Sequence, residues 1–114
     1  MIEISKELLS EVLGYKVDYI AGVGETYVGF HTEMGGTNIN IYELAHKCKE
    51  WANKQGYKKV YSGIYESTDQ GSMYICILDS NDTNCKDFWA DTEVEAIFKA
   101  CEWILANVKT NSLS

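Results

Sequence analysis

The segment Ser72–Asp79 limits the fold more than any other part of the chain. Its middle, Met73–Leu78, is apolar at consecutive positions, so both faces of a strand formed there are apolar. Polar stretches at 68–71 and 80–84 are typical of turns and end the segment on each side. The sequence therefore predicts a central β-strand whose two faces are both covered by other elements.

Three further segments carry apolar residues at helical spacing. Ser5, Asn40 and Thr92 stand at their starts, where these residue types cap helices. A glutamate follows three residues after Asn40 and after Thr92, which is the capping-box pattern. The sequence thus predicts helices over 5–13, 40–54 and 92–108.

The remaining segments complete an α+β pattern. We expect a hairpin within 15–37, which is rich in β-formers and glycine turns. Tyr57–Glu66 and Lys86–Ala90 are expected to flank the central strand, and the short loops imply antiparallel pairing. Amphipathic helices need apolar surface, and the central strand offers two faces. We therefore expect one domain, residues 1–114, with an antiparallel sheet between helices, an α/β/α sandwich, and a frayed polar tail at 109–114.

Acidic residues outnumber basic ones by 17 to 10, which gives a net charge of −7. The imbalance lies wholly in residues 62–95, which hold eight acidic residues and one lysine, whereas the other residues hold nine of each sign. A solvated surface that aids solubility is one interpretation. A surface that attracts a basic protein partner is the other. The candidate partner-binding residues are Glu66, Asp69, Asp79, Asp82, Asp87, Asp91, Glu93 and Glu95.

The composition also argues against several classes of partner. All ten basic residues are lysines and no basic stripe is present, so direct DNA or RNA binding is not expected. No apolar run is long enough to span a membrane, and residues 1–7 lack the features of a signal peptide. We therefore expect a cytoplasmic protein whose four cysteines are reduced thiols.

No motif indicates a metal, a cofactor or catalysis. The cysteines lack the close pairing of a zinc site. His46 shares a helical face with Glu43 and Glu50, which is typical of an exposed histidine between carboxylates. The acidic residues at 91–95 have a structural cause in the expected helix start.

The cysteines fall into two groups. Cys48, Cys76 and Cys101 occupy apolar positions and are expected in the core. Cys85 lies in a polar loop and is the expected reactive thiol. Catalysis by Cys85 would need a base, for which His31 is the unplaced candidate, and we do not expect it.

Three segments resemble the phage ABA sandwich domain family of small phage proteins. Glu7–Tyr15 is similar to its opening helix, which ends in glycine and an aromatic residue. Trp51–Tyr57 resembles its middle helix and the glycine and aromatic residue that follow, and Ala90–Ala100 its closing helix. Residues 15–37 have no counterpart. The resemblance implies an α/β/α sandwich of phage or prophage origin and brings no catalytic residues.

These observations predict a non-catalytic phage or prophage accessory protein that binds and inhibits a host protein in the host cytoplasm. An anti-CRISPR-type inhibitor is one concrete form, because a nucleic-acid-binding host surface is basic and complements an acidic one. A homo-oligomeric structural or assembly module is the first alternative. A small enzyme is the second.

Overall fold

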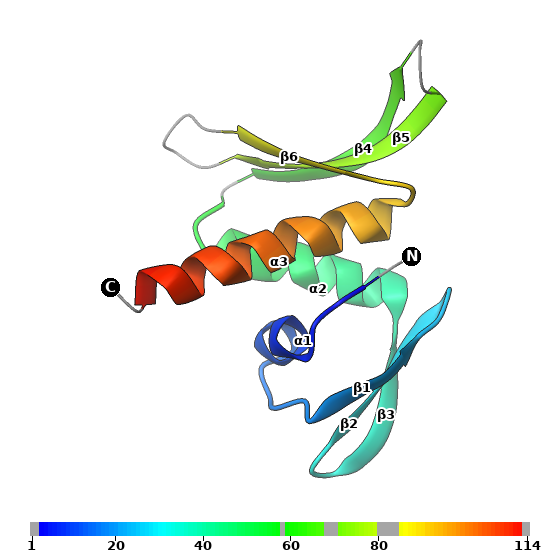
Figure 1. Cartoon of the computed structure of the whole chain (residues 1–114), viewed down its shortest axis with the longest axis vertical. Coiled ribbons are helices and arrows are strands. Elements are labelled where there is room, and N and C mark those ends of the chain that lie inside the picture. Colours follow the sequence, from blue (N-terminus) through cyan, green and yellow to red (C-terminus); the bar gives the residue numbers. More distant parts are fainter. Residues whose placement is uncertain (1–2, 58, 68–70, 80–84, 113–114) are drawn as a thin grey trace.

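The computed structural model describes residues 3–57, 59–67, 71–79 and 85–112 (Figure 1). The described residues form three helices and six strands within a flat molecule of 47 × 36 × 18 Å. In chain order these are α1 (Lys6–Leu13), β1 (Tyr19–Val23), β2 (Tyr27–Thr32), β3 (Gly35–Asn40), α2 (Ile41–Lys54), β4 (Lys59–Ser67), β5 (Gly71–Asp79), β6 (Cys85–Ala90) and α3 (Glu93–Ser112).

The strands form two separate antiparallel sheets, sheet A with order β1-β2-β3 and sheet B with order β4-β5-β6. The expected α+β fold with helices packed on antiparallel strands is confirmed. The layers differ from the expected α/β/α sandwich, because the helices lie between two sheets (Figure 1). Each strand pairs only with its neighbours in sequence, so the chain builds two small sheets where one was expected.

Sheet A contains the segment 15–37, for which the sequence predicted a hairpin. Strands β1 and β2 form that hairpin, and β3 adds a third strand on the other side of β2. Gly35 and Gly36 lie at the end of the region 15–37 in which the hairpin was expected, but Gly35 adopts φ 109° beside the turn and starts β3. Val28 and Phe30 point to the helices and are buried, whereas Tyr19 and Tyr27 are exposed.

Sheet B has the expected central strand. Strand β5 pairs along its whole length with β4, and from Tyr74 to Asp79 with β6. Cys76 and Leu78 are completely buried beneath α3, which lies along this face of the sheet. The period of two along a strand therefore directs Ile75 and Ile77 to the opposite face.

The helix starts follow the expected caps. Asn40 Oδ1 accepts hydrogen bonds from the amides of Tyr42 and Glu43, at 2.9 and 3.2 Å. Ser5 and Thr92 accept corresponding bonds at the starts of α1 and α3. Helix α3 runs to Ser112, so it includes residues 109–112 of the segment expected to be a frayed tail.

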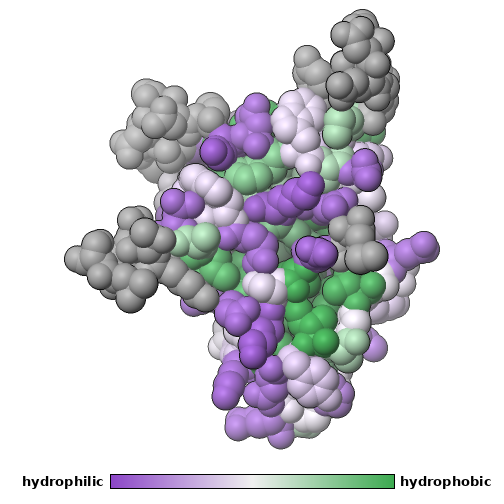
Figure 2. All heavy atoms as spheres, viewed as in Figure 1, coloured by the Kyte–Doolittle hydropathy of each residue, from purple (hydrophilic) through white to green (hydrophobic). Residues whose placement is uncertain are grey.

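One hydrophobic core joins all of these layers. Its fully buried members come from all three helices and both sheets, and they include Cys48, Cys76 and Cys101, as expected. The Cys101 thiol donates a hydrogen bond to the Cys48 carbonyl oxygen at 3.5 Å, which joins α3 to α2. Figure 2 shows hydrophobic residues gathered beside the N-terminal end of α2, next to sheet A, with hydrophilic residues around them.

Candidate binding surface

The face of sheet B that points away from α3 presents apolar residues of a central strand to solvent. We call it the outer face of sheet B. The strand register places on it residues of all three strands: Lys59, Tyr61, Gly63, Met73, Ile75, Ile77, Asp79, Asp87 and Trp89.

No described element packs on this outer face, and Figure 1 shows the helices on the other side of the sheet. Its aromatic side chains are open to solvent, Tyr61 at 56% and Trp89 at 38% exposure. Met73, Ile75 and Ile77 between them are partly exposed. The central strand was expected to be covered on both faces, and the described residues cover only one.

The outer face is organised in rows that cross the strands. One row contains Tyr61, Ile77 and Asp87, and the next contains Gly63, Ile75 and Trp89. A third row, at the end of β5, places Lys59 opposite Asp79. Ile75 and Ile77 therefore form an apolar middle strand, and the charged residues Lys59, Asp79 and Asp87 lie in the two rows nearest the end of β5.

The predicted acidic residues do not form one surface. Asp79 and Asp87 are diagonal neighbours on the outer face of sheet B. Glu93 lies instead on the helix side of the sheet, where it accepts a 2.5 Å hydrogen bond from Ser62 Oγ. Its carboxylate is also 3.9 Å from the Lys49 ammonium group on α2.

The other predicted acidic residues divide between the start of α3 and the undescribed part of the chain. Asp91 is exposed just before α3, and Glu95 lies in the first turn, where its amide donates to Thr92 Oγ1 at 3.1 Å. The Glu66 side chain, Asp69 and Asp82 lie outside the described residues. The role of all eight acidic residues in binding a partner stays a prediction.

A second exposed surface belongs to sheet A. The Tyr19 and His31 rings stack with centroids 4.6 Å apart and planes 13° from parallel. His31 pairs with Gly36 on its other side, and a Cβ atom at Gly36 would lie only 2.9 Å from His31 Cε1. The missing side chain at Gly36 therefore makes room for the histidine ring.

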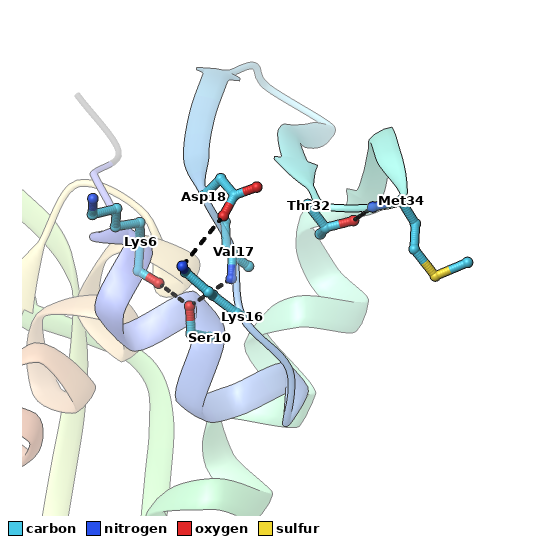
Figure 3. A network of polar contacts seen from close by, with 7 residues as sticks. All are labelled: Lys6, Ser10, Lys16, Val17, Asp18, Thr32 and Met34. Carbon is cyan, nitrogen blue, oxygen red and sulfur yellow. Dashed lines mark hydrogen bonds and ion pairs between the residues drawn. The ribbon is translucent and has the colours of Figure 1, made fainter.

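A hollow of about 570 Å³ lies between residues 15–18 and the β2–β3 turn. Figure 3 shows the polar contacts around it. Ser10 Oγ donates to the Lys6 carbonyl and accepts from the Val17 amide, which fixes the loop to α1. Lys16 and Asp18 lie 3.9 Å apart, and both are exposed, so this ion pair contributes little.

The described side chains offer no arrangement for metal binding, since no three His, Cys, Asp or Glu residues converge among them. His46 Nε2 lies 3.3 Å from the Glu50 carboxylate, and both side chains are exposed, as expected for this helical face. No helix formed by the described residues has the length and apolarity needed to span a membrane.

The buried thiols are unsuited to nucleophilic chemistry at neutral pH. Burial raises the pKa of the Cys76 thiol to about 12. Hydrogen bonding with Cys48, followed by burial, also raises the pKa of the Cys101 thiol. Because the thiolate is the reactive form, both groups stay inert. The Cys85 side chain lies outside the described residues, so its expected reactivity stays a prediction.

Comparisons with protein-family models, curated proteins and solved structures found no match for this chain. The resemblance to the phage ABA sandwich family therefore stays an expectation from the sequence. The outer face of sheet B is the surface that sequence reasoning did not identify. The apolar residues of Met73–Leu78, which alternate between the two faces of the strand, indicated that both faces are apolar. The sequence analysis expected a helix to cover the second face, so this face was not recognised as exposed.

Proposed function

We propose that this chain is a non-catalytic protein-binding module that acts through the outer face of sheet B. The observation that carries the proposal is the apolar character of a sheet face on which no described element packs. Antiparallel sheets that face water normally place polar residues outward, whereas this one presents Ile75, Ile77 and two aromatic residues. Contiguous exposed apolar surface of this kind is typical of protein interfaces.

The composition of the face supports a protein as its ligand. Tyr61 and Trp89 belong to the residue types that contribute most binding energy at interfaces. Among the described residues, the charged side chains of Lys59, Asp79 and Asp87 border the apolar middle strand, as polar residues border the apolar core of a protein interface. The buried, protonated thiols and the dispersed acidic groups support binding over catalysis.

The family resemblance and the acidic charge favour one form of this function, a phage or prophage accessory protein that inhibits a host protein in the host cytoplasm. In that form, Asp79 and Asp87 would meet lysine or arginine residues at the edge of the partner's apolar surface. An anti-CRISPR-type inhibitor would be one example, in which the basic surface of the host protein that the inhibitor covers normally binds nucleic acid.

The test compares affinity captures from lysate of the host cell with three tagged baits: wild type, Ile77→Lys and Tyr42→Lys. Ile77 lies at the centre of the outer face, whereas Tyr42 is exposed on α2, away from that face. We expect Ile77→Lys to stay folded and to lose the captured protein, and Tyr42→Lys to retain it. A partner that Ile77→Lys captures as well as wild type does would refute this surface as the binding site.

A further inference from the structure

We infer that the free edge of β4 binds an extended segment of another protein as an added strand, and that this segment places an acidic side chain next to α2. The edge is separate from the outer face of sheet B, so the inference goes beyond the proposed function and does not depend on it. Within the described residues, β4 pairs with β5 on one side only. Its other side therefore presents a row of backbone amide and carbonyl groups with which a further strand can pair.

Strand β4 lacks the features that normally protect an edge strand. Proteins protect such edges with short strands, charged residues, prolines or bulges. Strand β4 is nine residues long, and positions 60–65 hold no charged residue and no proline. Four of these six residues are valine, isoleucine or tyrosine, which are favoured in strands. The sequence of β4 thus suits pairing on both of its sides.

The other three edges of the described sheets are less suited to an added strand. Strand β1 has a bulge between Ile20 and Gly22. Four of the six residues of β3 are glycine or asparagine, which are unfavourable in strands. Strand β6 is six residues long and carries Lys86 and Asp87. Strand addition is therefore favoured at β4.

A hollow of about 390 Å³ between α2 and β4 specifies one side chain of the added strand. Val60 lines it from β4, on the helix side of the sheet. Paired residues of neighbouring strands point to the same face, so the residue that pairs with Val60 directs its side chain to this hollow. The lining residues of α2 are Lys49, Glu50, Asn53 and Lys54.

The charges around the hollow favour an acidic side chain. Residues 47–59 hold five lysines and one glutamate, which makes this the basic part of an acidic chain. Each glutamate near the hollow already has a partner, since Glu50 lies 3.3 Å from a histidine nitrogen one turn earlier and Glu93 lies 3.9 Å from Lys49. Lys54 is exposed in the last turn of α2 and can pair with a carboxylate of the added strand.

A second position of the added strand is specified four residues further along β4. Ile64 lies on the same side of the sheet as Val60 and is 63% exposed. It stands one row beyond Ser62, whose hydroxyl contacts the start of α3, and Figure 1 shows this end of the β4–β5 hairpin extending away from the helices. An apolar side chain that pairs with Ile64 covers it. The bound segment should therefore carry an acidic and an apolar residue four positions apart, in either chain direction.

The test pans a phage library of random linear peptides of nine residues, the length of β4, on the immobilised protein. We expect the enriched peptides to share an acidic and an apolar residue four positions apart, and to bind as synthetic peptides with dissociation constants of about 10–100 µM. Two further versions of one peptide carry N-methyl groups on alternate backbone amides, either at the odd or at the even positions. Because only alternate amides of a strand face its neighbour, one version should bind at least about tenfold more weakly and the other should bind like the parent.

Lys54→Glu tests the acidic position of the bound segment. Lys47→Glu is the matched control, because it changes the charge of the same helix equally and Lys47 lies outside the hollow. We expect the peptide to bind Lys54→Glu about tenfold more weakly than wild type, and Lys47→Glu about twofold more weakly through the long-range field alone. Equal losses in the two variants would contradict the place assigned to the acidic side chain.

Failure to enrich any peptide would overturn the inference, and so would loss of binding in both N-methylated versions or in neither. A peptide that no longer binds Ile77→Lys would occupy the outer face of sheet B and would also overturn it. In sedimentation equilibrium of the protein alone, a dimer that Ile64→Lys abolishes would assign the edge to a second copy instead. None of these results affects the capture experiment, in which Ile77→Lys tests the proposed function separately.

Discussion

Ser62 on β4 donates a 2.5 Å hydrogen bond to the carboxylate of Glu93, 31 residues later at the start of α3. The same carboxylate lies 3.9 Å from the ammonium group of Lys49 on α2. One partly exposed side chain thus connects an edge strand of sheet B to both long helices. Glu93 also stands where the positive end of the α3 dipole favours an anion.

Glu93→Gln should lower the free energy of unfolding by about 1–2 kcal/mol, because it weakens a charge-assisted hydrogen bond and removes an ion pair and a favourable dipole interaction. Urea denaturation followed by circular dichroism measures the change. Asp91→Asn is the control, since Asp91 is exposed just before the same helix. An equal loss in both variants would mean that the net charge near the helix start matters and the contact with Ser62 does not.

Gly36→Ala and Gly22→Ala should change stability in different directions. Gly22 is open, so alanine there should stabilise the protein by about 0.5 kcal/mol through the unfolded chain. At Gly36 the added Cβ atom displaces the His31 ring and breaks its stacking on Tyr19, which offsets that gain by about 1 kcal/mol. Urea midpoints and the proton shifts of the His31 ring check both effects, and an undisturbed His31 in Gly36→Ala would contradict the contact.

The buried thiols predict a loss of stability in mild alkali. The pKa of Cys76 is raised to about 12 in the folded protein, above the ordinary value of about 9 in the unfolded chain. Below pH 8 the thiol is protonated in both the folded and the unfolded state, so it does not change the free energy of unfolding with pH. Above pH 9 only the unfolded state releases the proton, so stability falls as the pH rises. Urea midpoints between pH 7.5 and 10 should show this decline, and Cys76→Ala should make it shallower, whereas the Cys101 thiol, whose pKa is also raised, still contributes to it. Identical slopes in the two proteins would exclude Cys76 as the cause.

Ile97→Asp should abolish folding or nearly so. Ile97 is 2% exposed in the middle of α3, and a buried unpaired carboxylate there costs about 3–5 kcal/mol, which is comparable with the total stability of such a domain. Ile97→Val removes one methyl group and should cost only about 1 kcal/mol. Thermal melts followed by circular dichroism separate the two, and an Ile97→Asp melting point close to that of wild type would be incompatible with the burial of this residue.

Local patterns in the sequence were sufficient for the helices and for sheet B. Asn40 and Thr92 accept the capping hydrogen bonds that their residue types predict, and the apolar segment 73–78 forms the central strand. Strand β3 was not predicted, because two consecutive glycines, Gly35 and Gly36, usually mark a turn and not the start of a strand. In the structure Gly35 adopts a positive φ beside the turn and Gly36 leaves room for the His31 ring. Both roles depend on the three-dimensional arrangement of the strands, which the local sequence does not specify.

The binding surface was harder to predict for a related reason. Net charge is visible in a sequence, so the acidic residues became the candidate site. Alternation along β6, however, places Asp87 on the outer face of sheet B, whereas Glu93 at the start of α3 lies on the helix side beside Ser62. Whether Ile75 and Ile77 lie under a helix depends on where the helices dock, which periodicity alone does not specify.

The separation of the strands into two sheets also affects how the chain folds. Every strand pair joins segments that follow one another directly, and the Glu33–Met34 turn between β2 and β3 is only two residues long. Each sheet can therefore assemble by closing short loops, which costs little chain entropy. Packing of α2 against α3, with Cys101 at the Cys48 carbonyl, then joins distant parts of the sequence, as does the hydrogen bond from Ser5 to Glu102. Because every strand pair is local, we expect rapid folding for a protein so rich in β-strands.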